Sequence, residues 1–204
     1  MLKQVDDRHA LLQSIPAKAA AYCQQLMEDQ SVAILLSKRR NSKWGDYRFG
    51  PSVQPRITVN RDLEAPLLLL TFLHEFAHHR TTQRHGRKVQ PHGKEWKACF
   101  IELMLPVLNQ AVFPDPLFSI IAEHMRSPRA NISSDQALYA YVHRHQPTNQ
   151  LTVADLSNGT HFTFRQHQYQ VIGRLRKRVK CLRIKDRRIY LFQPLTPIAG
   201  GQGH

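Results

Sequence analysis

The sequence has little cysteine and no long apolar run. Its 204 residues include three cysteines, Cys23, Cys99 and Cys181, which lie far apart and form no CxxC pair. This argues against a disulfide framework and a cysteine zinc ribbon, and it favours a reducing compartment inside the cell. The longest apolar stretch, residues 66–73, is too short to cross a bilayer, so we expect no membrane insertion. The first twelve residues show no apolar core or cleavage site, so we expect no signal peptide.

Acidic residues are scarce relative to basic ones. The chain has 29 Lys and Arg against 15 Asp and Glu, a net charge of +14. Such a surplus favours polyanionic partners, of which nucleic acid is the simplest. The charge is concentrated near the C-terminus, because residues 151–204 hold ten Lys or Arg and two Asp, a net charge of +8. The hydrophobic content of 42% is ordinary for a globular protein, and the length allows one domain followed by a small module.

The chain is organised around an apolar run that leads into His74-Glu75-Phe76-Ala77-His78, an HExxH motif. On a helix, residues i and i+4 share a face, so His74 and His78 can bind one metal ion. Glu75 lies one position further round the helix, where it can act as general base toward a metal-activated water. Such an apolar helix is normally buried, and a metal ion would give its buried polar side chains a partner. The alternative is a core helix whose histidines form only local hydrogen bonds.

The residues around the motif predict a small α+β domain. The expected elements are, in order, a helix over 14–29, strands over 31–37, 42–49 and 56–60, the HExxH helix from a cap at Asp62 to Gly86, and helices over 94–108, 118–125 and 136–145. A helix, a small three-stranded sheet, the HExxH helix and further helices form the order of a minimal zincin-like domain. In that arrangement an edge strand can align an extended peptide across the metal.

The character of the sequence changes near residues 146–149. Short alternating strands follow, over 151–156, 161–165, 169–172, 178–184 and 188–192. We therefore predict an α+β domain over 1–147 and a small basic all-β module over 148–204. Candidate nucleic-acid-binding residues in this module are Arg174, Arg176, Lys177, Arg178 and Lys180. A solvated, charged strand edge that resists aggregation explains the same cations equally well.

The third metal ligand is left open by the residues themselves. A catalytic zinc takes three protein ligands and keeps one position for water. Thr81 and Arg84 stand where the metzincin pattern requires Gly and His, which argues against that class. The remaining candidates are His85, which lies beyond the expected metal position, Glu95 or Glu102 in the manner of thermolysin-like enzymes, and His92, which follows a loop long enough to fold back.

TFLHEFAHH followed by HGKEWK resembles the SprT-like family of zinc metalloproteases, which includes the eukaryotic Spartan proteases. The resemblance covers roughly residues 14–145. It implies that His74, His78 and His92 bind one zinc ion, that Glu75 is the general base, and that the protein works in the bacterial cytosol or nucleoid. Bacterial members often carry a C-terminal zinc ribbon with paired cysteines. Only Cys181 lies in this region, so the resemblance implies a degenerate, cysteine-poor ribbon here.

The predicted function is a zinc-dependent metalloendopeptidase whose partners are a protein or peptide substrate and DNA. The resemblance implies substrates that are associated with DNA or crosslinked to it. Tyr47, Arg39 and Arg40 are candidates to stabilise negative charge that develops on the substrate. One rival is a non-catalytic, basic nucleic-acid-binding protein with a structural or vestigial zinc site. A second rival is a peptidase that regulates a transcription factor by the same zinc chemistry. The sequence does not indicate an oligomeric state.

Overall fold

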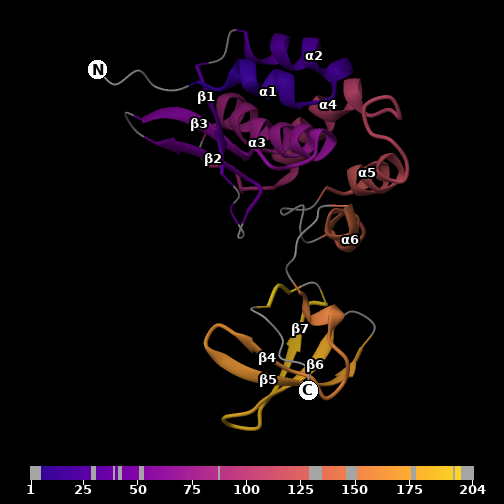
Figure 1. The fold of residues 1–204 in the computed structure, drawn as a ribbon. Helices are drawn as coiled ribbons and strands as arrows, with labels where there is room; N and C mark the ends of the chain where they lie inside the picture. Colours follow the sequence, from indigo (N-terminus) through magenta and orange to yellow (C-terminus); the bar gives the residue numbers. More distant parts are fainter. Residues whose placement is uncertain are drawn as a thin grey trace. The chain divides into compact units, whose positions relative to one another are not determined.

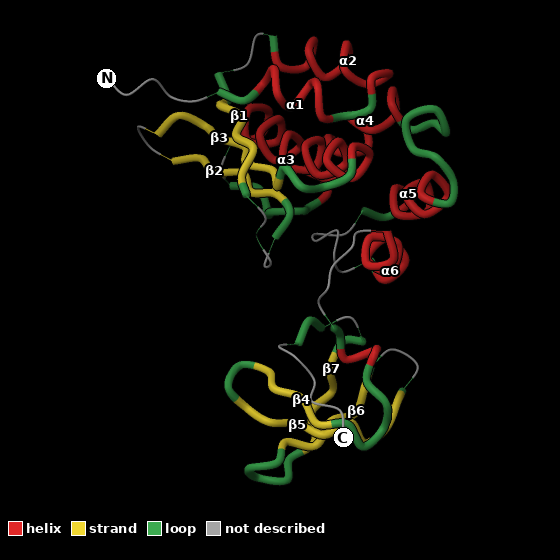
Figure 2. The backbone as a smooth tube through the Cα atoms, in the orientation of Figure 1, coloured by secondary structure: helices red, strands yellow, loops and turns green. Residues whose placement is uncertain are grey.

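A computed structural model describes residues 6–28, 31–38, 40, 43–50, 53–86, 88–128, 135–145, 151–175, 178–194 and 196–198. The chain divides into two compact units, residues 1–138 and 139–204. The described residues form six α-helices, a three-stranded sheet and a four-stranded antiparallel sheet (Figures 1 and 2). The protein is therefore of the predicted α+β class. The predicted domain boundary at 147 and 148 lies outside the described residues.

The sheet of the first unit consists of β1 (Ala33–Ser37), β2 (Gly45–Gly50) and β3 (Val53–Asn60). β3 is central, parallel to β1 and antiparallel to β2, so β2 is an edge strand. β3 starts earlier than predicted and includes Pro55. Proline is tolerated at this position because β1 begins to pair with β3 only at Arg56, so the missing N–H breaks no bond to β1.

Two helices precede the sheet, α1 (Arg8–Ser14) and α2 (Ala17–Met27). The single helix predicted to start at Ser14 is therefore wrong at its N-terminal end. Ser14 ends α1, where its hydroxyl donates to the carbonyl of Ala10 over 2.7 Å, and α2 begins after Pro16. The guanidinium of Arg8 donates to the carbonyls of Met27 and Val32, at 3.0 and 2.7 Å, and so ties α1 to the chain entering β1.

The HExxH motif lies on α3 (Ala65–His85), the central helix of the first unit (Figure 1). α3 contacts β2, β3 and α4 (Lys94–Met104). Residues 67–77 are all buried, as the apolar sequence predicts for a core helix. The N-cap is Glu64 rather than the predicted Asp62, and Gly86 ends the helix with a φ of 70°. A 3₁₀ turn, Leu105–Val107, follows α4 where the predicted helix would have continued.

The first unit also contains α5 (Leu117–Arg126), and α6 (Gln136–His145) begins at its end. Nδ1 of the buried His124 lies 2.9 Å from Oδ2 of Asp135. The other oxygen of Asp135 accepts the backbone N–H groups of Ala137 and Leu138, at 3.1 and 3.3 Å. Asp135 thus joins the start of α6 to α5. Among the helices described, none has the length and apolar character that crossing a membrane requires.

The second unit is a meander of β4 (His161–Phe164), β5 (His167–Arg174), β6 (Val179–Arg183) and β7 (Ile189–Phe192). Its core holds Val153, Leu156, Phe162, Tyr169, Val171, Val179, Cys181, Phe192 and Ile198. Cys181 is fully buried there, and burial raises its pKa to about 11, so it is an inert core thiol.

The strand predicted over 151–156 is wrong. Residues Val153–Asp155 form a 3₁₀ turn, in which Thr152 and Asp155 cap each other through their side chains. A single bridge joins Thr152 to Pro197, and the N–H of Ile198 donates to the carbonyl of Leu151 over 2.9 Å. The chain before this 3₁₀ turn is therefore paired with the chain that follows β7.

Candidate metal centre

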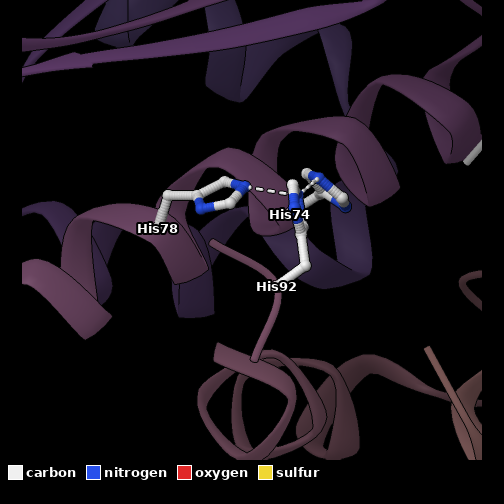
Figure 3. Close-up of side chains that lie close together, drawn as sticks. All are labelled: His74, His78 and His92. Atoms are coloured by element: carbon white, nitrogen blue, oxygen red, sulfur yellow. Dashed lines mark hydrogen bonds between the residues drawn. The ribbon is translucent and has the colours of Figure 1, made fainter. Parts of the chain in front are cut away.

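Three histidine side chains meet beside α3. His74 and His78 come from successive turns of the helix, and His92 comes from the turn that precedes α4 (Figure 3). Nε2 of His92 lies 2.9 Å from Nε2 of His78 and 3.4 Å from Nε2 of His74. Among the described residues these three form a group whose ligand atoms all lie within 4.8 Å of one another. The cluster could hold a metal ion.

The backbone at His92 explains how the loop delivers this side chain. His92 has a φ of 61°, in the left-handed region that non-glycine residues adopt infrequently. Gly93 follows, and a Cβ at this position would lie 3.0 Å from the carbonyl oxygen of Gln90. The tight turn therefore requires a small residue at 93 and a left-handed backbone at 92. Backbone strain of this kind is typical of functional sites.

The ring of Trp96 forms a wall against all three histidines. Its centroid lies 4.7 Å from that of His74, 5.2 Å from that of His78 and 4.7 Å from that of His92. Trp96 is fully buried and stacks on Phe100, with centroids 5.0 Å apart. This aromatic layer fixes the ring orientations and keeps water from one side of the cluster.

Burial keeps the three imidazoles neutral. Burial, followed by the neighbouring His78 and His92, lowers the pKa of His74 well below its usual value. Burial and His92 lower the pKa of His78 to about 3, and burial lowers that of His92. Neutral imidazole is the form that binds a metal ion. The cluster is therefore ready to accept a cation at neutral pH without first losing protons.

Glu75 lies on the sheet side of α3, where β2 holds its carboxylate. The backbone N–H of Tyr47 donates a hydrogen bond to this group, and the side chain is 8% exposed. Burial is the main reason that the pKa of Glu75 rises to about 7, with a contribution from the negative charge of Asp46. Asp46 itself stays ionised, because hydrogen bonds from Lys43 and Arg48 outweigh the effect of its own burial on its pKa.

Gly45 leaves the space that the Glu75 carboxylate fills. A Cβ on Gly45 would lie 2.6 Å from Oε1 of Glu75 and 2.8 Å from Cγ2 of Thr71. Any larger residue must therefore push β2 away from α3 or turn the carboxylate aside. The sequence pattern placed Gly45 in a strand but did not reveal this long-range contact.

We expect Gly45→Ala to reduce any activity that depends on Glu75 by roughly 100-fold, the cost of about 1 Å of misplacement. Metal content should stay at the wild-type level, because the three histidines do not touch Gly45. Gly50→Ala on the same strand is the matched control, since its nearest neighbour, Val53, lies at an ordinary 3.7 Å. Equal activity of the two variants in a peptide cleavage assay would show that the contact with Glu75 is unimportant.

The other ligand candidates lie elsewhere. Glu102 forms a two-point ion pair with Arg84, at 2.5 and 2.8 Å. His85 is exposed at the end of α3, and Glu95 is not part of the cluster. Among the candidates for charge stabilisation, Tyr47 stacks on His78 with centroids 6.4 Å apart. Arg40 donates instead to the side chain of Asn60 and the carbonyl of Thr58, and Arg39 lies outside the described residues.

The structure places three of the five basic candidates. Arg174 donates to the carbonyls of Ala154 and Leu156, and so helps to hold the second unit together. Arg178 directly precedes β6 and Lys180 lies on it, both half-buried. Arg176 and Lys177 lie outside the described residues. The proposed contact with nucleic acid stays a prediction.

Comparison with protein families agrees with the geometry. A model of the SprT-like family matches residues 12–111, the stretch that runs from α1 past the histidine cluster and α4. This part of the chain belongs to the SprT-like family. The match includes all three histidines and Glu75, and it ends before α5 and the second unit. Searches of curated proteins and of solved structures gave no match.

Proposed function

We propose that the chain is a zinc-dependent metalloendopeptidase with a zincin-like catalytic domain. The observation that carries this proposal is the convergence of three histidine Nε2 atoms, two of them from the helix that also carries the buried carboxylate of Glu75. Zn–N bonds of about 2.0–2.1 Å in a tetrahedral site hold the nitrogens roughly 3.3 Å apart. The separations of 2.9 and 3.4 Å between the Nε2 atoms fit this requirement. Three neutral imidazoles with one position left for water form the ligand set of a catalytic zinc.

The catalytic roles follow from where the side chains lie. A bound zinc ion supplies Lewis acidity, which polarises a carbonyl and lowers the pKa of water to about 7. Glu75 takes the proton from the attacking water and later delivers it to the leaving amine. The N–H of Tyr47 holds the carboxylate in one orientation during both transfers. β2 is the edge strand of the described sheet and contacts α3, which suits an extended substrate backbone lying alongside it.

We further propose that the substrates are proteins bound or crosslinked to DNA. The net charge of +14 supports this, because a basic protein accumulates near a polyanion and its on-rate increases. The concentration of positive charge in the second unit would keep the catalytic unit near DNA. Free peptides would then be poorer substrates than the same sequences on DNA.

The test is cleavage of one protein in two forms, crosslinked to a DNA duplex and free, before and after chelation. We expect cleavage of both forms, faster on DNA, complete loss with a chelator, and recovery when zinc is returned. Raising the salt concentration should slow cleavage of the DNA form more than that of the free form. A protein that binds one zinc ion per chain and DNA but cleaves neither form would instead be a non-catalytic binding protein.

A further inference from the structure

The last strand of the second unit is an apolar edge. β7 pairs with β6 on one side, and no other described strand lies beyond it. Ile189 and Leu191 are 55% and 54% exposed, although both stand within the strand. An edge strand with exposed apolar side chains is a template for pairing with another chain, and natural proteins usually protect it with charge or proline.

The backbone of β7 is oriented to accept a further strand. The N–H of Arg183 donates to the carbonyl of Arg188 over 2.8 Å, which fixes the alternation of the antiparallel ladder. Residues 190 and 192 therefore bond to β6, and the N–H and C=O groups of Ile189 and Leu191 point away from it. Among the described residues, no strand pairs with this side of β7, and no turn or loop hydrogen bond uses these four groups.

The side chains beside this edge form one apolar face. Ile189 is directly opposite Leu182, and Leu191 is opposite Lys180, so all four project from the same side of the sheet. Ile172 on β5 adds a further side chain that is 39% exposed. β4, the strand at the other end of the sheet, differs: its residues on this face are His161 and Thr163, which are polar. On this face the apolar side chains therefore lie on β5, β6 and β7, and β4 has none.

We propose that β7 is a docking site for an extended, acidic segment of a partner protein, which adds to the sheet as a further strand. The two outward-facing residues supply main-chain hydrogen bonds, and alternate apolar side chains of the segment cover Ile189 and Leu191. The positive charge around this edge favours a segment that is acidic. Lys180 lies beside Leu191, and the exposed Arg187 lies two residues before the strand. Arg188, by contrast, lies 3.6 Å from Asp186 and is partly neutralised by it.

Two other occupants fit less well. A second copy of the chain would bring together two modules that each carry a net charge of +8, and the acid nearest the edge, Asp186, is already paired with Arg183 and Arg188. Single-stranded nucleic acid binds by stacking its bases on aromatic rings. The aromatic side chains of the sheet face its core instead, where Phe162, Tyr169 and Phe192 are buried and Phe164 and Tyr190 pack against them. Aliphatic side chains and a free strand edge suit a peptide.

The probe is a short fluorescein-labelled peptide of alternating Glu and Val, titrated with the full chain and followed by anisotropy. We expect saturable binding that weakens about tenfold with Leu191→Pro, which removes one outward N–H but no bond to β6. Ile189→Glu should weaken binding at least as much, because it places a like charge against the segment. A peptide methylated on alternate backbone nitrogens should bind about tenfold more weakly as well, since it loses the donors that reach β7.

Thr163→Glu is the matched control, because it makes the same change of charge on the same face at the opposite end of the sheet. It should bind the probe like the wild type. Circular dichroism and thermal unfolding show whether each variant keeps its fold, and mass spectrometry shows that the probe stays intact. The proposal is wrong if the Glu-Val probe does not bind, or if a Lys-Val peptide binds equally well. It is also wrong if Thr163→Glu weakens binding as much as Ile189→Glu, or if Ile189→Glu abolishes binding of DNA while the peptide is unaffected.

Discussion

Replacing Glu75 with glutamine is expected to reduce proteolysis by roughly 10²- to 10⁴-fold, the usual contribution of a general base. The amide has nearly the same shape as the carboxylate, and its oxygen can still accept the N–H of Tyr47. The fold and the three histidines are therefore preserved. Metal content should equal that of the wild type, so the loss is one of proton transfer alone.

Protein stability provides a second readout for this variant. The carboxylate of Glu75 is buried, and burial is the main cause of its raised pKa, so the charged form is costly to hold in the folded chain. Glutamine removes this cost. The melting temperature of the metal-free variant should therefore be equal to or above that of the wild type, and a large decrease would indicate a structural role.

The pH dependence of the wild type follows from the same group. Without metal the pKa of Glu75 is about 7, and below that pH the carboxyl is protonated and cannot accept a proton. A nearby cation favours the charged form, so the acid limb of the cleavage profile should lie at or below pH 7. Glu64→Gln is the matched control, because Glu64 is exposed at the start of α3 and its side chain makes no cap hydrogen bond. Undiminished cleavage by Glu75→Gln would exclude the assigned role.

The sequence predicts the motif helix well because its signals are strong and local. An apolar run, a proline in the first turn and a glycine at the end define α3 to within a few residues. The i, i+4 spacing of His74 and His78 then places both rings on one face without further information. α1 was not predicted, since it is only seven residues long and no side chain caps its N-terminus.

Other features were missed for two different reasons, a local pattern that was misinterpreted and contacts that are remote in sequence. Residues 151–156 alternate like a strand, but the side chains of Thr152 and Asp155 bond to each other and stabilise a helical turn. The alternation of apolar and polar residues therefore led to a wrong prediction of a strand, although the capping pattern of Thr152 and Asp155 is visible in the sequence. The packing of Gly45 against Glu75 and of Trp96 against the histidines joins separate elements, so no periodicity reveals it. The prediction that His92 is the third ligand came from the family resemblance. Its turn needs a left-handed backbone, which sequence spacing does not indicate.

Replacing His92 with alanine is expected to weaken metal binding by more than about 100-fold. Loss of a residue that only hydrogen-bonds to a metal ligand already weakens metal binding about 10- to 100-fold, and loss of a ligand itself should cost more. His74 and His78 alone would provide two ligands from one helix. The turn itself should survive, because alanine, like histidine, has an unbranched Cβ at this φ of 61°. Metal content after gel filtration and titration with a competing chelator would measure the change.

Thermal unfolding separates this effect from damage to the fold. A ligand at 1,000 times its Kd adds about 4.1 kcal/mol to the free energy of unfolding. Zinc should therefore raise the melting temperature of the wild type but hardly that of His92→Ala, while the two metal-free proteins unfold at similar temperatures. His85→Ala is the matched control, because His85 is the exposed histidine at the end of the same helix and lies outside the cluster. It should respond to zinc like the wild type. If His85→Ala lost the zinc response and His92→Ala kept it, the loop before α4 would not supply the third ligand, and the site would have to close differently around His74 and His78.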